Sequence, residues 1–404
     1  MTDDLPAVVA ELEHLLKLRT IPFGMKLFER REDMEAIPKI RRPQAIHTLD
    51  QIVGQASRLG WTVGITSEDL VGAQCRAVVG LGEAKTDAWK SGRHMTGVWF
   101  STETAGVNER NVREWLAAQA ASGYVDYDDT DGRFGLNAQQ RAVFVDEDGP
   151  AYMGGGFELA AEMFLDEPKV AEAFRSGLGL GWHERCGCLF RGTERFFRPG
   201  RTANLLDVWL PALEGVEAKL KAGARVADVG CGHGGAVIMM AQAFPNAHLV
   251  GFDYHGPSVE HARAAAEVAG VAGRVRFERA AAKDFGEGGE FDLITMFDAL
   301  HDMGDPVGAA QHMRSRLTAE GTCMLVEPNA ADSLSENLKN PFSRIMYSAS
   351  TMICTPVSMS QEVGLALGAA AGPGRLTEVA RQAGFTRVRR VAEESPSLVL
   401  ELKR

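Results

Sequence analysis

The stretch "VADVGCGHGGAVIMMAQAFPNAHLVGFDYH", residues 226–255, decides the fold. It begins with a short apolar run, passes three glycines at every second position, continues as a helix-like segment and ends with a second apolar run. Glycine adopts positive φ and carries no side chain, so a turn with Gly230, Gly232 and Gly234 lets a ligand approach the backbone closely. A strand, such a turn and a helix in this order are typical of ligand-binding α/β folds.

Two acidic residues distinguish between the ligands that such a turn can hold. Asp253 closes the second apolar run, where a carboxylate can accept hydrogen bonds from ribose hydroxyls. A dinucleotide fold carries G-x-G-x-x-G and places pyrophosphate on the helix N-terminus. Here the pattern is "GCGHGG", preceded by Asp228. That acid repels pyrophosphate but suits the sulfonium and ammonium groups of S-adenosylmethionine, so charge favours this methyl donor as the cofactor.

Composition limits the class of protein and its partners. The 404 residues suit two or three domains, and the net charge of -11 argues against general binding to nucleic acid or anionic membranes. The start "MTDDLPAVVAELEHLL" lacks a basic leader, and no apolar run is long enough to span a membrane, so we expect a cytoplasmic protein with no membrane partner. The six cysteines show no disulfide-rich spacing, so we expect reduced thiols.

Residues 1–103 form an N-terminal segment of mixed α/β pattern and unknown role. The stretches "LLKLRTIPFGMKLF" and "SEDLVGAQCRAVVGLGE" resemble the first half of an uncharacterised domain family of archaea and bacteria. A family without known chemistry implies no site residues. A substrate-binding lid, a dimerisation element and the remains of a larger domain stay open as its role.

Residues 104–200 contain a helix-and-hairpin pattern followed by a linker. Apolar residues recur at helical spacing at Val112, Trp115, Leu116 and Ala120. Asn108 or Glu109 can cap this helix, and Gly123 ends it. The following "YVDYDDTDGRFGL" alternates around a turn, as a β-hairpin does. A helix followed by a hairpin is the second half of a winged helix.

The charges on this helix argue against DNA recognition. A helix that reads DNA usually brings net positive charge to the phosphates, whereas here Arg110 and Arg113 are balanced by Glu109 and Glu114. We therefore expect the region to serve packing or dimerisation, with DNA binding as the less favoured alternative.

Residues 201–404 alternate strand-like and helix-like stretches. The strand-like runs are "RVADVG", "AHLVGFD", "VRFERA", "FDLITMF" and "GTCMLVEP". This alternation predicts a doubly wound α/β domain with a mostly parallel sheet covered on both faces. The end, "TRVRRVAEESPSLVLELKR", reads instead as a closing hairpin that adds one antiparallel strand.

Several motifs together resemble a bacterial family of class I S-adenosylmethionine-dependent methyltransferases with a winged-helix-like N-terminal domain. These motifs are "VADVGCGHGG", "GFDYH", "FDALHDMGDP" and the linker "GWHE…FRGTERFFRPG". The resemblance covers about residues 104–404. It implies a seven-stranded sheet of order 3-2-1-4-5-7-6 with strand 7 antiparallel, and a homodimer.

The resemblance also implies the cofactor contacts. It places the cofactor over the glycine turn, with its ribose on Asp253 and its adenine beside Tyr254. The full set of expected cofactor-binding residues is Asp228, Gly230, Gly232, Asp253, Tyr254, Ala282, Lys283 and Phe297. Many class I enzymes hold the adenine amino group with an Asp after the third strand, but Ala281 stands there. Backbone groups of Ala282 and Lys283, or the side chain of Asp284, are the alternatives.

The acceptor side is predicted around "FDALHDMGDP". His301 is our candidate general base, because an imidazole takes a proton near neutral pH and similar methyltransferases use a His at this place. Glu327, at the end of the fifth strand, is a second catalytic candidate that would orient the acceptor. The alternatives are that His301 only caps the next helix, and that Glu327 only binds nearby backbone amides.

Substrate contacts are predicted from two further stretches. The aromatic linker gives Trp182, His183 and Phe197, with interdomain packing as the alternative. The stretch 340–368 resembles the family's insertion over the acceptor pocket and gives Met346, Tyr347 and Met352, with core packing as the alternative. The linker's H-x-x-C-x-C supplies only three ligands and lacks zinc spacing, so we expect no metal site.

The sequence therefore predicts a methyltransferase that uses S-adenosylmethionine to methylate a small molecule, with oxygen preferred over nitrogen or sulfur because His301 offers a base. One rival is a winged-helix transcriptional regulator that uses the α/β domain as a cofactor sensor. It requires a basic face on residues 104–140 that the sequence lacks. A second rival keeps the cofactor but uses its positive charge to steer a different reaction.

Overall fold

The computed structural model describes residues 108–130, 132–286, 289–394 and 397–404. The chain divides into two compact units, Met1–Glu158 and Leu159–Arg404. The expected N-terminal segment 1–103 lies outside the described residues. The domain boundaries near residues 103 and 200 stay predictions, although residues 159–200 fall within the same unit as the sheet.

The described part of the first unit contains the expected helix and hairpin. Its elements are α6 (Glu109–Ala121), β1 (Asp126–Asp128), β2 (Arg133–Gly135), α7 (Ala138–Phe144) and the start of α8 (Gly154–Leu165). The side chain of Asn108 caps α6 by accepting a hydrogen bond from the Asn111 N–H at 3.2 Å. Strands β1 and β2 pair antiparallel, with Tyr127 opposite Phe134. The predicted elements are confirmed here.

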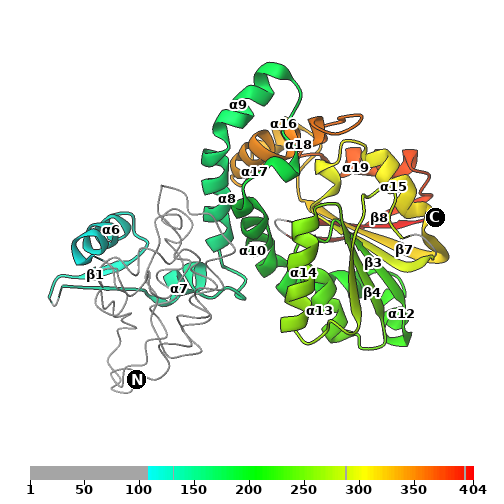
Figure 1. The fold of residues 1–404 in the computed structure, drawn as a ribbon, viewed down its shortest axis with the longest axis horizontal. Helices are drawn as coiled ribbons and strands as arrows, with labels where there is room; N and C mark the ends of the chain where they lie inside the picture. Colours follow the sequence, from blue (N-terminus) through cyan, green and yellow to red (C-terminus); the bar gives the residue numbers. More distant parts are fainter. Residues whose placement is uncertain (1–107, 131, 287–288, 395–396) are drawn as a thin grey trace, which may run out of the picture. The chain divides into compact units, whose positions relative to one another are not determined.

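The second unit is an α/β domain with a preceding helical region (Figure 1). Its strands are β3 (Arg225–Val229), β4 (His248–Asp253), β5 (Val275–Arg279), β6 (Phe291–Phe297), β7 (Leu317–Pro328), β8 (Arg387–Glu394) and β9 (Ser397–Lys403). Its longer helices are α9 (Glu167–Ser176), α10 (Gly187–Asn204), α12 (Val216–Ala222), α13 (Gly235–Ala243), α14 (Gly256–Val268), α15 (Pro306–Ser315), α17 (Ser343–Ala349) and α19 (Gly372–Gln382). Short segments are η5 (Trp182–Glu184), η6 (Leu205–Trp209), α11 (Leu210–Ala212), η7 (Leu300–Asp302), α16 (Leu334–Asn337), η8 (Ser350–Cys354) and α18 (Thr355–Met359).

The sheet has seven strands in the order β5-β4-β3-β6-β7-β9-β8. The first five strands of this order are parallel, whereas β9 runs antiparallel to both β7 and β8. This is the predicted order 3-2-1-4-5-7-6 with strand 7 antiparallel, so the fold prediction is confirmed. Parallel neighbours require crossover helices, which bury both faces of the sheet.

Alternate residues along the strands belong to two separate hydrophobic cores, one on each face of the sheet. On β3, Val226 belongs to the cluster that α12, α13 and α14 cover, and its neighbour Ala227 belongs to the cluster that α15 and α19 cover. Figure 1 shows these helix groups on opposite faces of the sheet. Successive strand side chains point to opposite faces, so both sets of apolar residues are buried. The central strands are rigid for that reason, and their carboxyl ends carry the loops described below.

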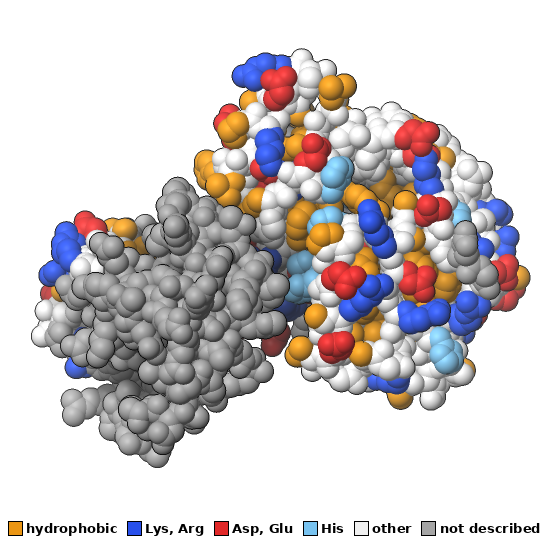
Figure 2. All heavy atoms as spheres, viewed as in Figure 1, with side chains coloured by type: hydrophobic (Ala, Val, Ile, Leu, Met, Phe, Trp, Pro, Cys, Tyr) orange, Lys and Arg blue, Asp and Glu red, His pale blue; other side chains and the backbone are white. Residues whose placement is uncertain are grey.

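The described helices contain none that is both long and apolar enough to cross a membrane. On the visible face of the Leu159–Arg404 unit, Figure 2 shows acidic and basic side chains interspersed with hydrophobic and histidine side chains. No single-sign charged surface appears on that face.

Candidate active site

The glycine turn connects β3 to α13 and lies at the carboxyl edge of the sheet. Gly230, Gly232 and Gly234 all have positive φ, of 75°, 51° and 80°. A Cβ on Gly234 would lie 2.7 Å from the Phe277 ring, so this position has no room for a side chain. The sequence places glycine where the backbone conformation demands it, and the turn leaves its backbone bare toward a cavity.

Asp253 fixes the glycine turn from the end of the neighbouring strand. Its Oδ2 accepts a hydrogen bond from the Gly232 N–H at 2.9 Å, and its Oδ1 accepts one from the His255 N–H at 2.8 Å. Burial raises the pKa of this carboxyl, while the two backbone hydrogen bonds oppose that rise. Each carboxylate oxygen has a further lone pair, so Asp253 can hold the turn and still accept ribose hydroxyls.

A cavity of about 420 Å³ opens over this turn. Eleven predicted site residues line it: Trp182, His183, Phe197, Asp228, Gly230, Gly232, Asp253, Tyr254, Ala282, Lys283 and Phe297. All eight expected cofactor residues are thus gathered around one space, together with three of the expected substrate residues. The volume is in the range of small-molecule and cofactor sites.

Two carboxyls, of which Asp228 is buried and Asp298 is partly buried, line the cavity beside the turn. Asp228 is 2% exposed, and its Oδ1 accepts a hydrogen bond from the Thr295 hydroxyl at 2.7 Å. Asp298, which the sequence analysis did not select, also lines the cavity and has a φ of 48°, rare for a residue with a side chain. Burial raises the pKa of Asp228 to about 7 and that of Asp298 to about 8. Both groups would be stabilised in their charged form by a cation in the cavity.

A positive side chain completes this end of the cavity, and the sequence analysis missed it. Arg201 on α10 pairs with Glu194, and both side chains line the cavity although they are at most 16% exposed. The buried Nε of Arg201 has no hydrogen-bond partner among the described residues. A Cβ on Gly235, the first residue of α13, would meet the Arg201 guanidinium at 2.3 Å. Arg201 therefore lies at the N-terminus of α13, where a carboxylate would be doubly favoured.

The loop after β5, where the adenine is expected, lines a further part of the cavity. Ala281, Ala282 and Lys283 line the cavity, whereas the Asp284 carboxylate accepts a hydrogen bond from the Ala281 N–H at 2.8 Å. Asp284 thus shapes the loop from behind, and of the two expected arrangements the geometry favours the backbone groups. Lys283 forms ion pairs of 3.1 Å with Asp305 and 2.9 Å with the exposed Glu362.

His301 and Glu327, the expected catalytic residues, contact each other behind the cavity wall. Glu327 Oε2 pairs with His301 Nδ1, and Glu327 Oε1 accepts a hydrogen bond from the Leu300 N–H at 2.9 Å. His301 Nε2 lies 3.2 Å from Asp302 Oδ1, and Asp302 is the member of this group that lines the cavity. Burial alone would lower the pKa of His301, but Asp302 and Glu327 hold it well above its ordinary value. The two carboxylates therefore favour the protonated form of the imidazole, whereas the expected role as general base requires the neutral form.

Three substrate contacts were expected from the stretch 340–368, and none of them is among the residues that line the cavity. Met346 is buried in a cluster with Leu189, and Met352 packs against the same cluster. The hydroxyl of Tyr347 accepts a hydrogen bond from Asn337 at 3.1 Å. Their role as substrate contacts stays a prediction, and the geometry is that of the core-packing alternative.

The cysteines differ from expectation at one place. Cys186 and Cys188 form a disulfide, so the expectation of reduced thiols is wrong for this pair. Bonded sulfurs also cannot serve as thiolate ligands in the H-x-x-C-x-C stretch. Among the described residues, the side chains spaced to hold a metal ion are those of His301, Asp302 and Cys354, whose donor atoms lie within 4.8 Å of one another.

Comparison with protein families gives two matches. Residues 220–384 match a family described as "Methyltransferase domain", and residues 11–125 match a family described as "Uncharacterised ArCR". Both matches agree with the resemblances in the sequence, and the methyltransferase match covers the first five strands of the sheet in chain order, β3 to β7.

Similar solved structures share the fold at low sequence identity. An O-methyltransferase family protein from Burkholderia thailandensis is 16% identical, with a TM-score of 0.58 over 89% of this chain and 99% of that chain. Human N-acetylserotonin methyltransferase, solved with S-adenosylmethionine, is 13% identical, with a TM-score of 0.57 over 83% and 93% of the two chains. An O-methyltransferase of neocarzinostatin biosynthesis, solved with S-adenosylmethionine and a hydroxynaphthoic acid, is 16% identical, with a TM-score of 0.53 over 83% and 96%. The class I methyltransferase fold is therefore shown.

Proposed function

We propose that this protein transfers the methyl group of S-adenosylmethionine to a hydroxyl oxygen of a small molecule. The observation that carries the proposal is the cavity over the glycine turn, because it brings together Asp253, Asp228 and Arg201 at the carboxyl ends of the parallel strands. Ligands of doubly wound sheets bind at this edge. The solved relatives that contain this cofactor support the same assignment.

Each part of the cofactor has a matching group in the cavity. Asp253 offers carboxylate oxygens to the ribose hydroxyls, and Arg201 with the N-terminus of α13 offers positive charge to the cofactor's carboxylate. Asp228 and Asp298 offer negative charge to its ammonium and sulfonium groups. A positive ligand is favoured here because buried carboxyls without a cation carry a desolvation cost.

The chain's own residues would take up the acceptor's proton. Asp302 faces the cavity, His301 lies behind it, and Glu327 lies behind His301, so Asp302 is the member of this connected group that would accept a proton. When the acceptor hydroxyl attacks the methyl carbon, its proton passes to this group through Asp302. Holding acceptor and methyl group together in a water-poor space supplies the rest of the acceleration.

The regulator alternative gains no support from the described part of residues 104–140. Arg110 pairs with Glu114 within α6, so its charge is already compensated. A functional site with several buried ionisable groups, in contrast, is typical of an enzyme.

The test of the cofactor assignment is isothermal titration calorimetry with S-adenosylmethionine and S-adenosylhomocysteine. Wild-type protein should bind both, and Asp253→Ala should weaken both by about 100-fold because ribose hydrogen bonds to a charged group are lost. Glu362→Gln, a change at an exposed cavity residue, serves as the control. Wild-type affinity in Asp253→Ala would contradict the placement. The product mass with candidate hydroxylated acceptors would show whether a methyl group is transferred, and nuclear magnetic resonance of the product would identify the methylated atom.

A further inference from the structure

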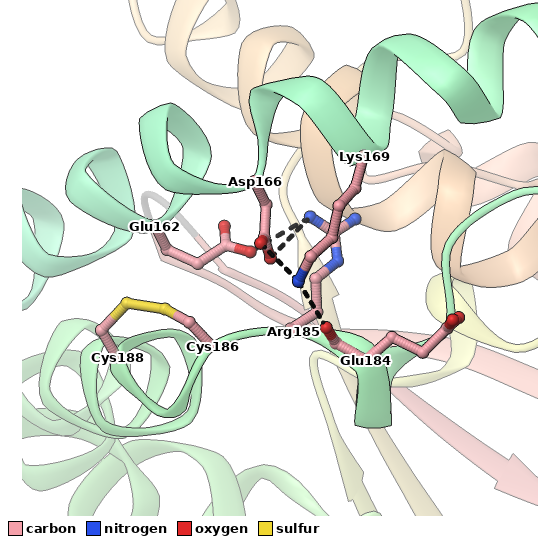
Figure 3. The surroundings of a disulfide bond; sticks show 7 residues. All are labelled: Glu162, Asp166, Lys169, Glu184, Arg185, Cys186 and Cys188. Carbon is pink, nitrogen blue, oxygen red and sulfur yellow. Dashed lines mark hydrogen bonds and ion pairs between the residues drawn. A yellow bond between two sulfur atoms is a disulfide. The ribbon is translucent and has the colours of Figure 1, made fainter. Parts of the chain in front are cut away.

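The disulfide between Cys186 and Cys188 lies at the start of α10. Cys186 is the N-cap residue of this helix, Cys188 is its second residue, and both side chains are half-buried. Figure 3 shows the bond beside the charged side chains of Glu162, Asp166 and Arg185. The sequence analysis singled out this stretch, and the proposed function does not use it.

This disulfide is not explained as a structural crosslink. In the chain-entropy model the stabilisation from a disulfide grows with the length of the loop it closes. Here the bonded cysteines are separated by Gly187 alone, so the bond restricts the unfolded chain little. The helix that follows is instead held by packing, since Leu189 is fully buried in a hydrophobic cluster.

The position at a helix N-terminus favours the reduced form of the pair. No side chain caps α10 in the disulfide state. A thiolate at the N-cap would accept a first-turn N–H and would be stabilised by the helix dipole, which is why cysteines at helix N-termini have lowered pKa values. Reduction would create this cap and oxidation would remove it. The reduced form is therefore favoured, and we expect the disulfide to exchange readily with thiols.

The residue before the cysteine pair is anchored by buried contacts, and the helix after the pair lines the cavity. Arg185 immediately precedes Cys186, is fully buried, and contacts Glu162 at 3.1 Å and the Met352 carbonyl oxygen at 2.7 Å. Two residues after Cys188, Phe190 lines the cavity and packs on the ring of His255 with 4.3 Å between centroids. Arg185 is held in place by these contacts, whereas Phe190 belongs to the cavity wall. A conformational change in the first turn of α10 would therefore move the cavity wall and leave Arg185 in place.

We propose that Cys186 and Cys188 are a redox-active pair that exchanges with low-molecular-weight thiols. A thiolate attacks one Sγ, the sulfur–sulfur bond breaks, and its electron pair leaves on the other cysteine as a thiolate. A second thiolate attacks the resulting mixed disulfide and releases the second cysteine together with the oxidised thiol. Two electrons thus pass from two thiols to the protein, and the oxidised small thiol reverses the reaction.

A consequence that rests on the proposed function is a change in cofactor affinity between the two states. Five residues of α10 line the cavity: Phe190, Thr193, Glu194, Phe197 and Arg201. We expect reduction to change the affinity for S-adenosylhomocysteine by about fivefold, the lower end of typical couplings between sites.

The test is thiol mapping of the folded, full-length protein in mixtures of reduced and oxidised glutathione. Iodoacetamide is added without denaturant, and peptide masses locate the label. After reduced glutathione we expect two labels on the peptide with Cys186 and Cys188, and none on it when oxidised glutathione is added before iodoacetamide, while the buried Cys231, Cys323 and Cys354 stay unlabelled in both cases. Circular dichroism should be unchanged throughout.

Two mapping results would overturn the proposal. One is a disulfide that excess reduced glutathione reduces only after the protein has been unfolded. This result would identify a static crosslink. The other is labelling of both cysteines in air-oxidised protein, which shows that the bond does not form. Cys75 is assigned by its own peptide, and Cys75→Ser serves as the control variant.

Calorimetry with S-adenosylhomocysteine then tests the coupling. Cys186→Ser should bind with the affinity of the reduced wild type in both buffers, whereas Cys75→Ser should respond to glutathione as the wild type does. Equal affinities of oxidised and reduced wild type would refute the coupling. Failure of both forms to bind would contradict the proposed function instead, and the thiol mapping is independent of it.

Discussion

The affinity for S-adenosylmethionine should rise steeply with pH, because a partly buried carboxyl with a raised pKa must lose its proton to face the cofactor's cation. Asp298 lines the cavity, and burial raises its pKa to about 8. A positive sulfonium favours the ionised carboxylate, so binding lowers this pKa and releases a proton. The affinity therefore falls as pH drops below the pKa of the free protein.

The size of the effect follows from that pKa. At pH 6 a carboxyl with a pKa of about 8 is ionised in about one molecule in 100, so binding that needs the ionised form is about 100-fold weaker than at pH 9. Asp228, with a pKa of about 7, adds up to about tenfold. S-adenosylhomocysteine has the same ammonium and carboxylate groups but no charged sulfur, so its affinity should change much less.

The assay is calorimetry with both ligands from pH 6 to pH 9. Buffers with different ionisation enthalpies give the number of protons released on binding. Asp298→Asn should flatten the profile for S-adenosylmethionine, since the amide does not titrate and Asn tolerates positive φ. Glu362→Gln, at an exposed group of the same cavity, should leave it unchanged. Identical pH profiles for the two ligands, without proton release for S-adenosylmethionine, would refute the reasoning.

The same carboxyl affects the stability of the unliganded protein with the opposite dependence on pH. Its pKa is raised in the folded state, so the folded protein holds a proton that the unfolded chain releases. The free energy of unfolding therefore decreases as pH rises from about 4 to about 8. Asp298→Asn should raise the melting temperature at pH 8.5 and change it less at pH 5. A loss of stability at both pH values would show that the carboxyl has a structural role.

Four further predictions test other parts of the molecule. Arg201→Ala should weaken S-adenosylmethionine binding by about tenfold but leave binding of methylthioadenosine, which lacks the amino-acid tail, unchanged in calorimetry. His301→Ala should cut turnover by about 10²–10⁴-fold while cofactor binding survives, and an unchanged rate would remove it from the mechanism. Arg185→Met leaves Glu162 buried without its cation and should lower the free energy of unfolding by about 3–5 kcal/mol in urea titration. Light scattering should give the mass of a homodimer, and a monomer would contradict that expectation.

The fold could be read from the sequence because its causes are local. Apolar runs of strand length, separated by helix-like segments, fix a parallel sheet, and the final hairpin fixes the antiparallel strand. The glycine turn and Asp253 were also readable, since a bare turn and an acid at the end of the next strand are set by position along the chain. Neither depends on contacts with distant residues.

The roles of the other cavity groups depend on distances that no local pattern contains. Asp298 stands in the quoted "FDALHDMGDP" and Arg201 directly follows the quoted linker, but only the tertiary structure brings them into one cavity and raises the pKa of Asp298, mainly through burial. Met346 illustrates the converse, because the sequence left both pocket lining and core packing open for it, and the structure buries it in a hydrophobic cluster with Leu189. The sequence by itself determined which elements form and where the cofactor turn lies. Tertiary packing decided which charges face the cavity and which cysteines are bonded, because burial and proximity arise only when distant segments meet.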